Sequence, residues 1–236
     1  MKVNEIPFHQ LLARPLLVRY NASRLFEGHD VLSWPDGADA ILGYAYYDRQ
    51  AGLNLAILAP ANFEEGVVYH DAAPLATAKA RMMLRPGTYD ECDAATFSED
   101  DEEQLVELYA EDCRISDSYW ADDPDVVEML RIAEIDHLRH PQYPLDVQVY
   151  YLIESGGIEA VWIRLEGFSE EGHLTGELLN QPYGECVAVT GDLMALGATK
   201  DGENVLRLFT RDEMILEPRG RMRYEEFTRR RAEERK

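Results

Sequence analysis

The chain has 236 residues, and its 45 acidic residues outnumber its 23 basic residues, which gives a formal net charge of −22 at pH 7. A hydrophobic content of 46% is ordinary for a globular protein, so a buried core is expected rather than disorder. Because nucleic-acid binding needs clustered lysine and arginine, this composition excludes DNA and RNA as expected partners, and it argues against binding to an anionic membrane.

The beginning of the chain does not resemble a targeting signal. Leu11, Leu12 and Ala13 are apolar, but Arg14 and Pro15 end the run well short of the apolar stretch of a secretory signal peptide. No apolar segment is long enough to form a transmembrane helix. The three cysteines are widely spaced and form no Cys-x-x-Cys pair, so we expect a cytoplasmic protein with free thiols, no disulfide framework and no zinc site.

Short apolar runs separated by turns dominate the first β-rich part, residues 1–90. Gly52 lies in a short polar loop between two of these runs, which is typical of a β-hairpin. Pro74 is placed to begin a helix through Leu84, because proline suits the first turn of a helix. The predicted strands are residues 16–18, 40–47, 53–58 and 67–70.

An acidic helical segment is expected over residues 91–144. Ser98 and Asp101 have the spacing of a helix capping pair, and the apolar residues that follow predict one amphipathic helix to about Asp112. A second helix should begin at Asp123, a capping residue that precedes a proline. The predicted buried residues are Leu105, Leu108 and Tyr109 on the first helix and Val127, Leu130 and Leu138 on the second.

The last third of the chain is rich in short apolar runs at roughly ten-residue spacing. Such spacing predicts an antiparallel meander or a small barrel over residues 145–218, followed by a charged tail, residues 219–236, with a short surface helix. The expected fold class is therefore α+β, with antiparallel β-rich N-terminal and C-terminal parts flanking two acidic amphipathic helices. Whether these parts form one domain or two stays open. The predicted strands are residues 147–153, 160–165, 174–179, 187–189, 192–196 and 205–209.

Most of the negative charge is concentrated in one segment. Residues 90–128 hold sixteen acidic residues and a single basic one, Arg114. The helix dipole favours acids in a first turn, so part of this run is explained as a solvated helix face. The surplus, with aromatic side chains among it, predicts a negative face that attracts a basic protein, although core packing of the same rings is the alternative. The predicted partner-binding residues are Glu99, Asp100, Asp101, Glu102, Glu103, Tyr119, Trp120, Asp122 and Asp123.

No motif of a catalytic or metal site stands out. Glu134, His137 and His140 repeat every third residue, but a di-iron site would need further helices that carry the same Glu-x-x-His spacing. The regular acidic pattern of a calcium loop is missing, and no nucleotide-binding or hydrolase motif occurs. His70 and Asp71 could act as an acid–base couple, but no motif places a nucleophile beside them. We therefore expect no metal, no cofactor and no catalytic residue.

Residues 145–218 carry a family resemblance. Two short sequence patterns and a Gly-Asp turn make up the match, in the order Glu-x-x-Trp, Gly-x-Leu-x-Asn-x-Pro and Gly-Asp. The residues of this pattern are Glu159, Trp162, Gly176, Leu178, Asn180, Pro182, Gly191 and Asp192. In this pattern the segment resembles the small YegJ-like bacterial domain of unknown function. The resemblance implies a compact β-rich module, and it carries over no catalytic residue.

Three functions fit these observations. The first is a non-enzymatic interaction protein that binds a basic protein through its acidic face, with a bacterial immunity protein that neutralises a cationic toxin as one concrete form. The second is a small-ligand-binding or hydrolytic enzyme module with its site between the two β-rich parts. The third is a protein whose acidity serves solubility alone. The first is the main hypothesis.

Overall fold

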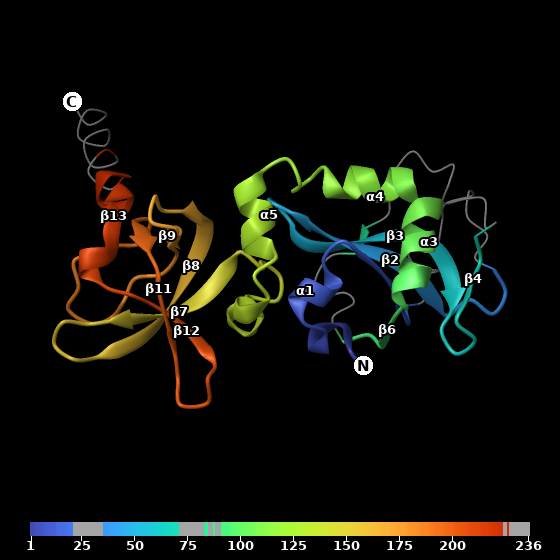
Figure 1. Cartoon of the computed structure of the whole chain (residues 1–236), viewed down its shortest axis with the longest axis horizontal. Coiled ribbons are helices and arrows are strands. Elements are labelled where there is room, and N and C mark those ends of the chain that lie inside the picture. Colours follow the sequence, from blue (N-terminus) through green and yellow to red (C-terminus); the bar gives the residue numbers. More distant parts are fainter. Residues whose placement is uncertain (21–34, 71–82, 85–86, 88–90, 224–225, 227–236) are drawn as a thin grey trace, which may run out of the picture. The chain divides into compact units, whose positions relative to one another are not determined.

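The computed structural model describes residues 1–20, 35–70, 83–84, 87, 91–223 and 226, and it divides into two compact units (Figure 1). Unit 1 contains residues 1–123 and 141–143, and unit 2 contains residues 124–140 and 144–236. Each unit has its own antiparallel-rich sheet and its own helices, which confirms the α+β fold class. Among the described residues, no helix has the length and apolar character needed to cross a membrane.

Unit 1 is built on a six-stranded antiparallel sheet with the order β4-β3-β2-β1-β6, in which β5 also pairs with β3. Its centre is the predicted hairpin, where the Asp48 carboxylate accepts the backbone N–H groups of Gln50 and Ala51 and Gly52 adopts a left-handed φ of 80°. Both faces of the hairpin are buried, as its nearly continuous apolar sequence requires. The strands are β1 (Arg14–Val18), β2 (Ala40–Asp48), β3 (Gly52–Asn62), β4 (Val67–Val68), β5 (Met83–Leu84) and β6 (Ala94–Thr96).

Short helical segments accompany this sheet. A 3₁₀ turn, η1 (Val3–Glu5), and one turn of helix, α1 (Phe8–Leu11), precede β1. After β6, the chain forms α3 (Glu99–Leu108) and α4 (Ala110–Asp117), which lies on β2 and β3 (Figure 1). The two helices are separate because Tyr109 leaves the helical conformation, with φ −108° and ψ 27°.

Unit 2 begins with α5 (Pro124–Leu130) and the 3₁₀ segment η3 (Ala133–Leu138), and it continues as a seven-stranded sheet. The strand order is β11-β12-β7-β8-β9-β10-β13, and every pairing is antiparallel except the parallel pair β12–β7. Residues 219–223 are helical, at the start of the predicted tail helix. The strands are β7 (Asp146–Leu152), β8 (Ile158–Phe168), β9 (Leu174–Leu178), β10 (Leu193–Ala195), β11 (Gly197–Lys200), β12 (Leu206–Thr210) and β13 (Ile215–Glu217), with a 3₁₀ turn η4 (Asp212–Met214) before the last.

A buried arginine fixes the helical start of unit 2. Arg139 is only 8% exposed, and its guanidinium donates to the Asp136 carboxylate and to the carbonyl groups of Pro144, Met129 and Ile132. Burial lowers the pKa of Arg139, and the Asp136 carboxylate opposes this shift. Because its donors are satisfied, this buried charge holds the segment after α5 in place rather than forming a free site.

Several expected details of the secondary structure are wrong. Met83–Leu84 is a strand and not the end of a helix, whereas Pro74 lies outside the described residues. Residues 187–189 form no strand, because the Asp212 carboxylate occupies two of their N–H groups. The first acidic helix divides at Tyr109, so Leu108 lies at a helix end and is 60% exposed. The predicted helical segment 91–144 therefore contributes α3 and α4 to unit 1 and α5 to unit 2.

Candidate functional site

The exposed carboxylates of α3, of α4 and of the loop after α4 form what we call the acidic surface of unit 1. Helix α3 begins as the sequence predicts, since the Ser98 hydroxyl group donates to the Asp101 carboxylate at 2.6 Å and accepts the Asp101 N–H group. No residue of α3 is buried, so this helix contributes little to the core. The members of the acidic surface are Glu99, Asp100, Asp101, Glu103, Glu107, Glu111, Asp112 and Asp122.

Three members of the acidic surface lie in one row along α3. Glu99, Glu103 and Glu107 follow one another at four-residue spacing, so they share one face of the helix at about 6 Å per step. None of the three makes an ion pair with another described residue. Like charges at this spacing destabilise a helix by roughly 0.2–0.5 kcal/mol per pair. The row therefore carries an energetic cost that no ion pair with a described residue offsets.

Two of the predicted partner-binding carboxylates are engaged within unit 1. Glu102 faces Arg14 at 3.2 Å and has 13% of its side chain exposed, and Asp123 faces Arg49 at 3.1 Å. The pKa of Glu102 is raised, mainly by burial and also by the nearby Glu99, while the Arg14 charge opposes this shift. These two residues attach the helical segment to β1 and to the β2–β3 hairpin rather than adding free charge to the acidic surface.

The two predicted aromatic anchors have different environments. Tyr119 is 44% exposed and its ring lies 5.5 Å from that of Tyr46, a core residue. Trp120 is 3% exposed, so it belongs to the core of unit 1 and does not present its ring to a partner. The alternative of core packing therefore describes Trp120, whereas Tyr119 keeps the accessibility that an interface aromatic requires.

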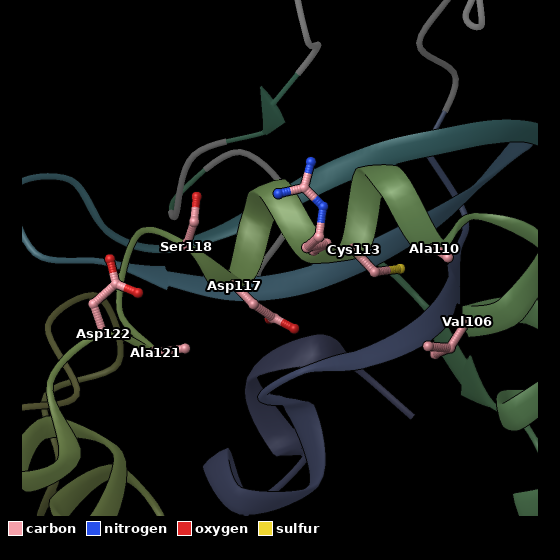
Figure 2. Close-up of a pocket in the computed structure, with 8 residues that line it drawn as sticks. Val106, Ala110, Cys113, Asp117, Ser118, Ala121 and Asp122 are labelled. Carbon is pink, nitrogen blue, oxygen red and sulfur yellow. The ribbon is translucent and has the colours of Figure 1, made fainter.

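An open cavity of about 490 Å³ lies beside α4, and its lining extends from Val106 in α3 through α4 to Asp122 in the following loop (Figure 2). This volume is within the range of small-ligand sites. Its start is apolar and its end carries two carboxyl groups, those of Asp117 and Asp122. The lining residues are Val106, Ala110, Cys113, Arg114, Asp117, Ser118, Ala121 and Asp122.

Asp117 is the most unusual group of this cavity. Both of its carboxylate oxygens accept the Tyr44 hydroxyl group, at 3.1 and 3.0 Å, which ties α4 to β2. Burial raises the pKa of Asp117 above its ordinary value, while the Tyr44 hydroxyl group and the nearby indole of Trp120 oppose this shift. The Tyr44 pKa is raised by burial first and by the Asp117 charge second. Asp117 makes no ion pair within the described part of the chain, so its charge lacks a cationic partner there.

Among the described residues, the buried indole N–H group of Trp120 has no hydrogen-bond acceptor. The indole is nevertheless near enough to the Asp117 carboxyl group to oppose the rise of its pKa. The Cys113 thiol lines the same cavity from a buried position. No local pattern predicts this cluster, because Tyr44 and Asp117 are 73 residues apart and belong to no motif.

The residues considered for metal or acid–base chemistry do not assemble into a site. Within the described residues, no group of three or more metal-ligating side chains is present. His137 contacts the Leu206 carbonyl oxygen at 3.0 Å, and the His140 ring packs edge-on against Trp162. His70 lies 2.9 Å from the Tyr109 hydroxyl group, while its predicted partner Asp71 is outside the described residues.

In unit 2, Glu159, Trp162 and Asn180 organise a loop. The Glu159 carboxylate accepts the backbone N–H groups of Tyr183 and Gly184 at 2.6 and 2.7 Å. The side-chain amide oxygen of Asn180 accepts the backbone N–H group of Trp162 at 2.7 Å. These contacts fix the chain after β9 against β8. The Glu-x-x-Trp and Asn-x-Pro patterns thus have structural roles in this loop.

The glycine positions of the same pattern have steric reasons. A Cβ atom on Gly176 would lie 2.4 Å from the Arg164 carbonyl oxygen, so only glycine fits between β8 and β9. Gly191 has φ 95°, and the buried Asp192 beside it accepts the N–H groups of Val189 and Gly220 at 2.9 Å each. The Gly-Asp turn therefore holds the segment after β13 in place through hydrogen bonds.

Asp212 is a second hydrogen-bond acceptor that holds a loop in place, and no sequence pattern predicts it. Its carboxylate accepts the Tyr151 hydroxyl group and the N–H groups of Val187 and Ala188. Burial raises the pKa of Asp212, but these three hydrogen bonds together lower it below the ordinary value. Burial first, and the Asp212 charge second, raise the pKa of the nearby Cys186 thiol.

Comparison with known proteins identifies no relative. No protein-family model, no curated protein and no solved structure matches the chain.

Proposed function

We propose that this chain is a non-enzymatic interaction protein whose acidic surface binds a basic protein partner. The observation that carries the proposal is the row of Glu99, Glu103 and Glu107, which is exposed and makes no ion pair with any described residue. The positive charges of a cationic partner would offset the mutual repulsion of these three glutamates.

Folding requirements account for only part of this charge. The helix dipole favours acids in the first turn of α3, which includes Glu99, but it acts weakly beyond that turn. Glu103 and Glu107 lie further along the helix and gain nothing from it. Solubility alone needs scattered charge rather than a row on one face, so a complementary partner explains the arrangement better.

The second support is the composition of the segment that follows α4. Tyr119 adds an exposed aromatic ring close in sequence to Asp122, and protein interfaces are enriched in tyrosine. Charged groups at the edge of an interface steer the association of two proteins and raise its rate. In its most concrete form, the proposal is an immunity protein whose carboxylates cover the nucleic-acid site of a cationic toxin. The resemblance of residues 145–218 to the YegJ-like domain is part of the proposal as a separate β-rich module.

The alternative, a small-ligand-binding or hydrolytic module with a site between the β-rich parts, stays a prediction. The described carboxyl groups with shifted pKa values include Asp117 in unit 1 and Asp212 in unit 2. Asp212 is saturated by hydrogen bonds, as fits a structural role.

The test is a charge-reversal comparison on the full chain. One variant carries E99K, E103K and E107K, and a control with the same change in net charge carries E154K, E170K and E203K, which are exposed acids of unit 2. Each immobilised protein is exposed to a cell extract of the native host at about 50 mM and about 500 mM salt, because screening separates electrostatic binding from other binding.

The expected result is a basic protein that the wild type and the control retain at low salt, that high salt releases, and that the α3 variant does not retain. The captured protein is then purified and titrated against all three chains. Equal binding by the α3 variant and the control, or binding that is indifferent to salt, would overturn the proposal.

A further inference from the structure

The cavity along α4 has a graded chemistry that the proposed function does not yet use. Val106, Ala110 and Cys113 make its start apolar, and Asp117 and Asp122 make its end acidic (Figure 2). An aliphatic chain that ends in a cation matches this order. Arginine and lysine side chains have that form, since both bury an apolar stem while the charged head stays near polar groups.

The Asp117 carboxylate is held ready for such a cation. The Tyr44 hydroxyl group orients both of its oxygens, and Tyr44 is itself 2% exposed in the core. The indole N–H group of Trp120, which is 3% exposed and has no hydrogen-bond acceptor among the described residues, favours the charged form of the same carboxyl group. A half-buried carboxylate surrounded by neutral donors and without a described cationic partner is costly, and a bound cation would remove that cost.

We propose that this cavity binds one arginine side chain of the basic partner, with its guanidinium on Asp117 and its aliphatic stem against Cys113 and Ala110. This inference rests on the proposed function and assigns the partner's anchor residue. Arginine is favoured over lysine because its planar fork pairs with a carboxylate through two hydrogen bonds and because it is more weakly hydrated. Asp122, exposed and free of ion pairs in the described residues, supplies the second negative charge.

One lining residue opposes this ligand, which gives the proposal a sharp test. Arg114 also lines the cavity, and it makes no ion pair with Asp117 or with any other described residue. Its positive charge repels a guanidinium, so the Arg114→Gln variant should bind the arginine probe more tightly. A zwitterionic ligand such as a free amino acid would instead use Arg114 for its carboxylate, and the same variant would then bind it more weakly.

The experiment titrates N-acetyl-arginine methylamide into the isotope-labelled full chain and follows backbone amide shifts by NMR. The citrulline analogue, which has the same shape without the charge, is the matched control. The expected result is saturable shifts confined to amides of residues 106–122, at least tenfold weaker binding of citrulline, and at least tenfold weaker binding of the arginine probe by Asp117→Asn. Asparagine can still accept the Tyr44 hydroxyl group, so this variant should keep the fold.

Three results would overturn the inference: equal binding of both probes, no effect of Asp117→Asn, or weaker binding by Arg114→Gln. The outcome is separable from the proposed function, because the E99K, E103K and E107K variant leaves the cavity residues unchanged. If that variant loses the protein partner while Asp117→Asn keeps it, the acidic surface stands and only the arginine cavity fails.

Discussion

Replacing Glu103 with lysine should stabilise α3 while it weakens partner binding. In the folded chain Glu103 repels Glu99 on one side and Glu107 on the other, and it makes no ion pair with another described residue. Lysine at this position would remove both repulsions and add two attractions at four-residue spacing. At roughly 0.2–0.5 kcal/mol for each of these contributions, the variant should gain about 0.8–2 kcal/mol.

Hydrogen exchange of the α3 amides is the suitable assay, because α3 has no buried residue and should open locally before unit 1 unfolds. A gain of this size slows exchange by roughly fourfold to thirtyfold. The Glu103→Gln variant, which only removes the repulsions, should give about half of the free-energy gain. Glu170→Lys, an equal charge change in unit 2, should leave α3 exchange unaltered.

Unchanged or faster hydrogen exchange of α3 in Glu103→Lys would contradict this prediction. Such a result would mean that the row of carboxylates is not repulsive in the folded chain. A faster-exchanging α3 would also indicate that Glu103 stabilises the fold through a contact, which would remove the main support for a binding role.

Three further predictions concern stability. Asp212→Ala should cost about 2–4 kcal/mol in urea denaturation, because the Tyr151 hydroxyl group and two backbone N–H groups lose their acceptor; a loss below about 1 kcal/mol would contradict this. The raised pKa of Asp117 gives stability that is present below its unfolded pKa of about 3.9 and lost as the pH rises through the folded value. Relative to Asp117→Asn, the wild type should therefore lose stability as the pH rises above about 4, and a constant difference in unfolding free energy would refute the assignment. Gly52→Ala should disrupt the β2–β3 hairpin and lower the melting temperature, since φ is 80° and the added Cβ would lie 2.0 Å from the Gln142 carbonyl oxygen. A variant that unfolds at the same temperature as the wild type would contradict this prediction.

Local patterns predicted the central hairpin and the starts of the acidic helices well. Apolar runs around Gly52 and the capping pair at Ser98 act within a few residues, so the sequence alone contains their cause. The break at Tyr109 was missed because nothing in the local sequence marks it, and the exposure of Leu108 follows from that break. Short strands such as β11 lacked an apolar run and depend on pairing with their neighbours.

The candidate site was only half visible in the sequence. The concentration of acids pointed to α3 directly, because charge is a property of composition. The burial of Trp120 and the engagement of Glu102 by Arg14 depend on packing across the unit, which no spacing rule reveals. The contact between Tyr44 and Asp117 joins distant parts of the chain, and only the folded unit brings them together.

The most direct test of the central claim is the affinity of the purified basic partner for the E99K, E103K and E107K variant and for the E154K, E170K and E203K control, measured over a range of salt. The account predicts that the control binds like the wild type, whereas the α3 variant binds at least about a hundredfold more weakly and loses its salt dependence. Equal affinities and equal salt dependence for the two variants would contradict the claim that the acidic surface of unit 1 is the binding site.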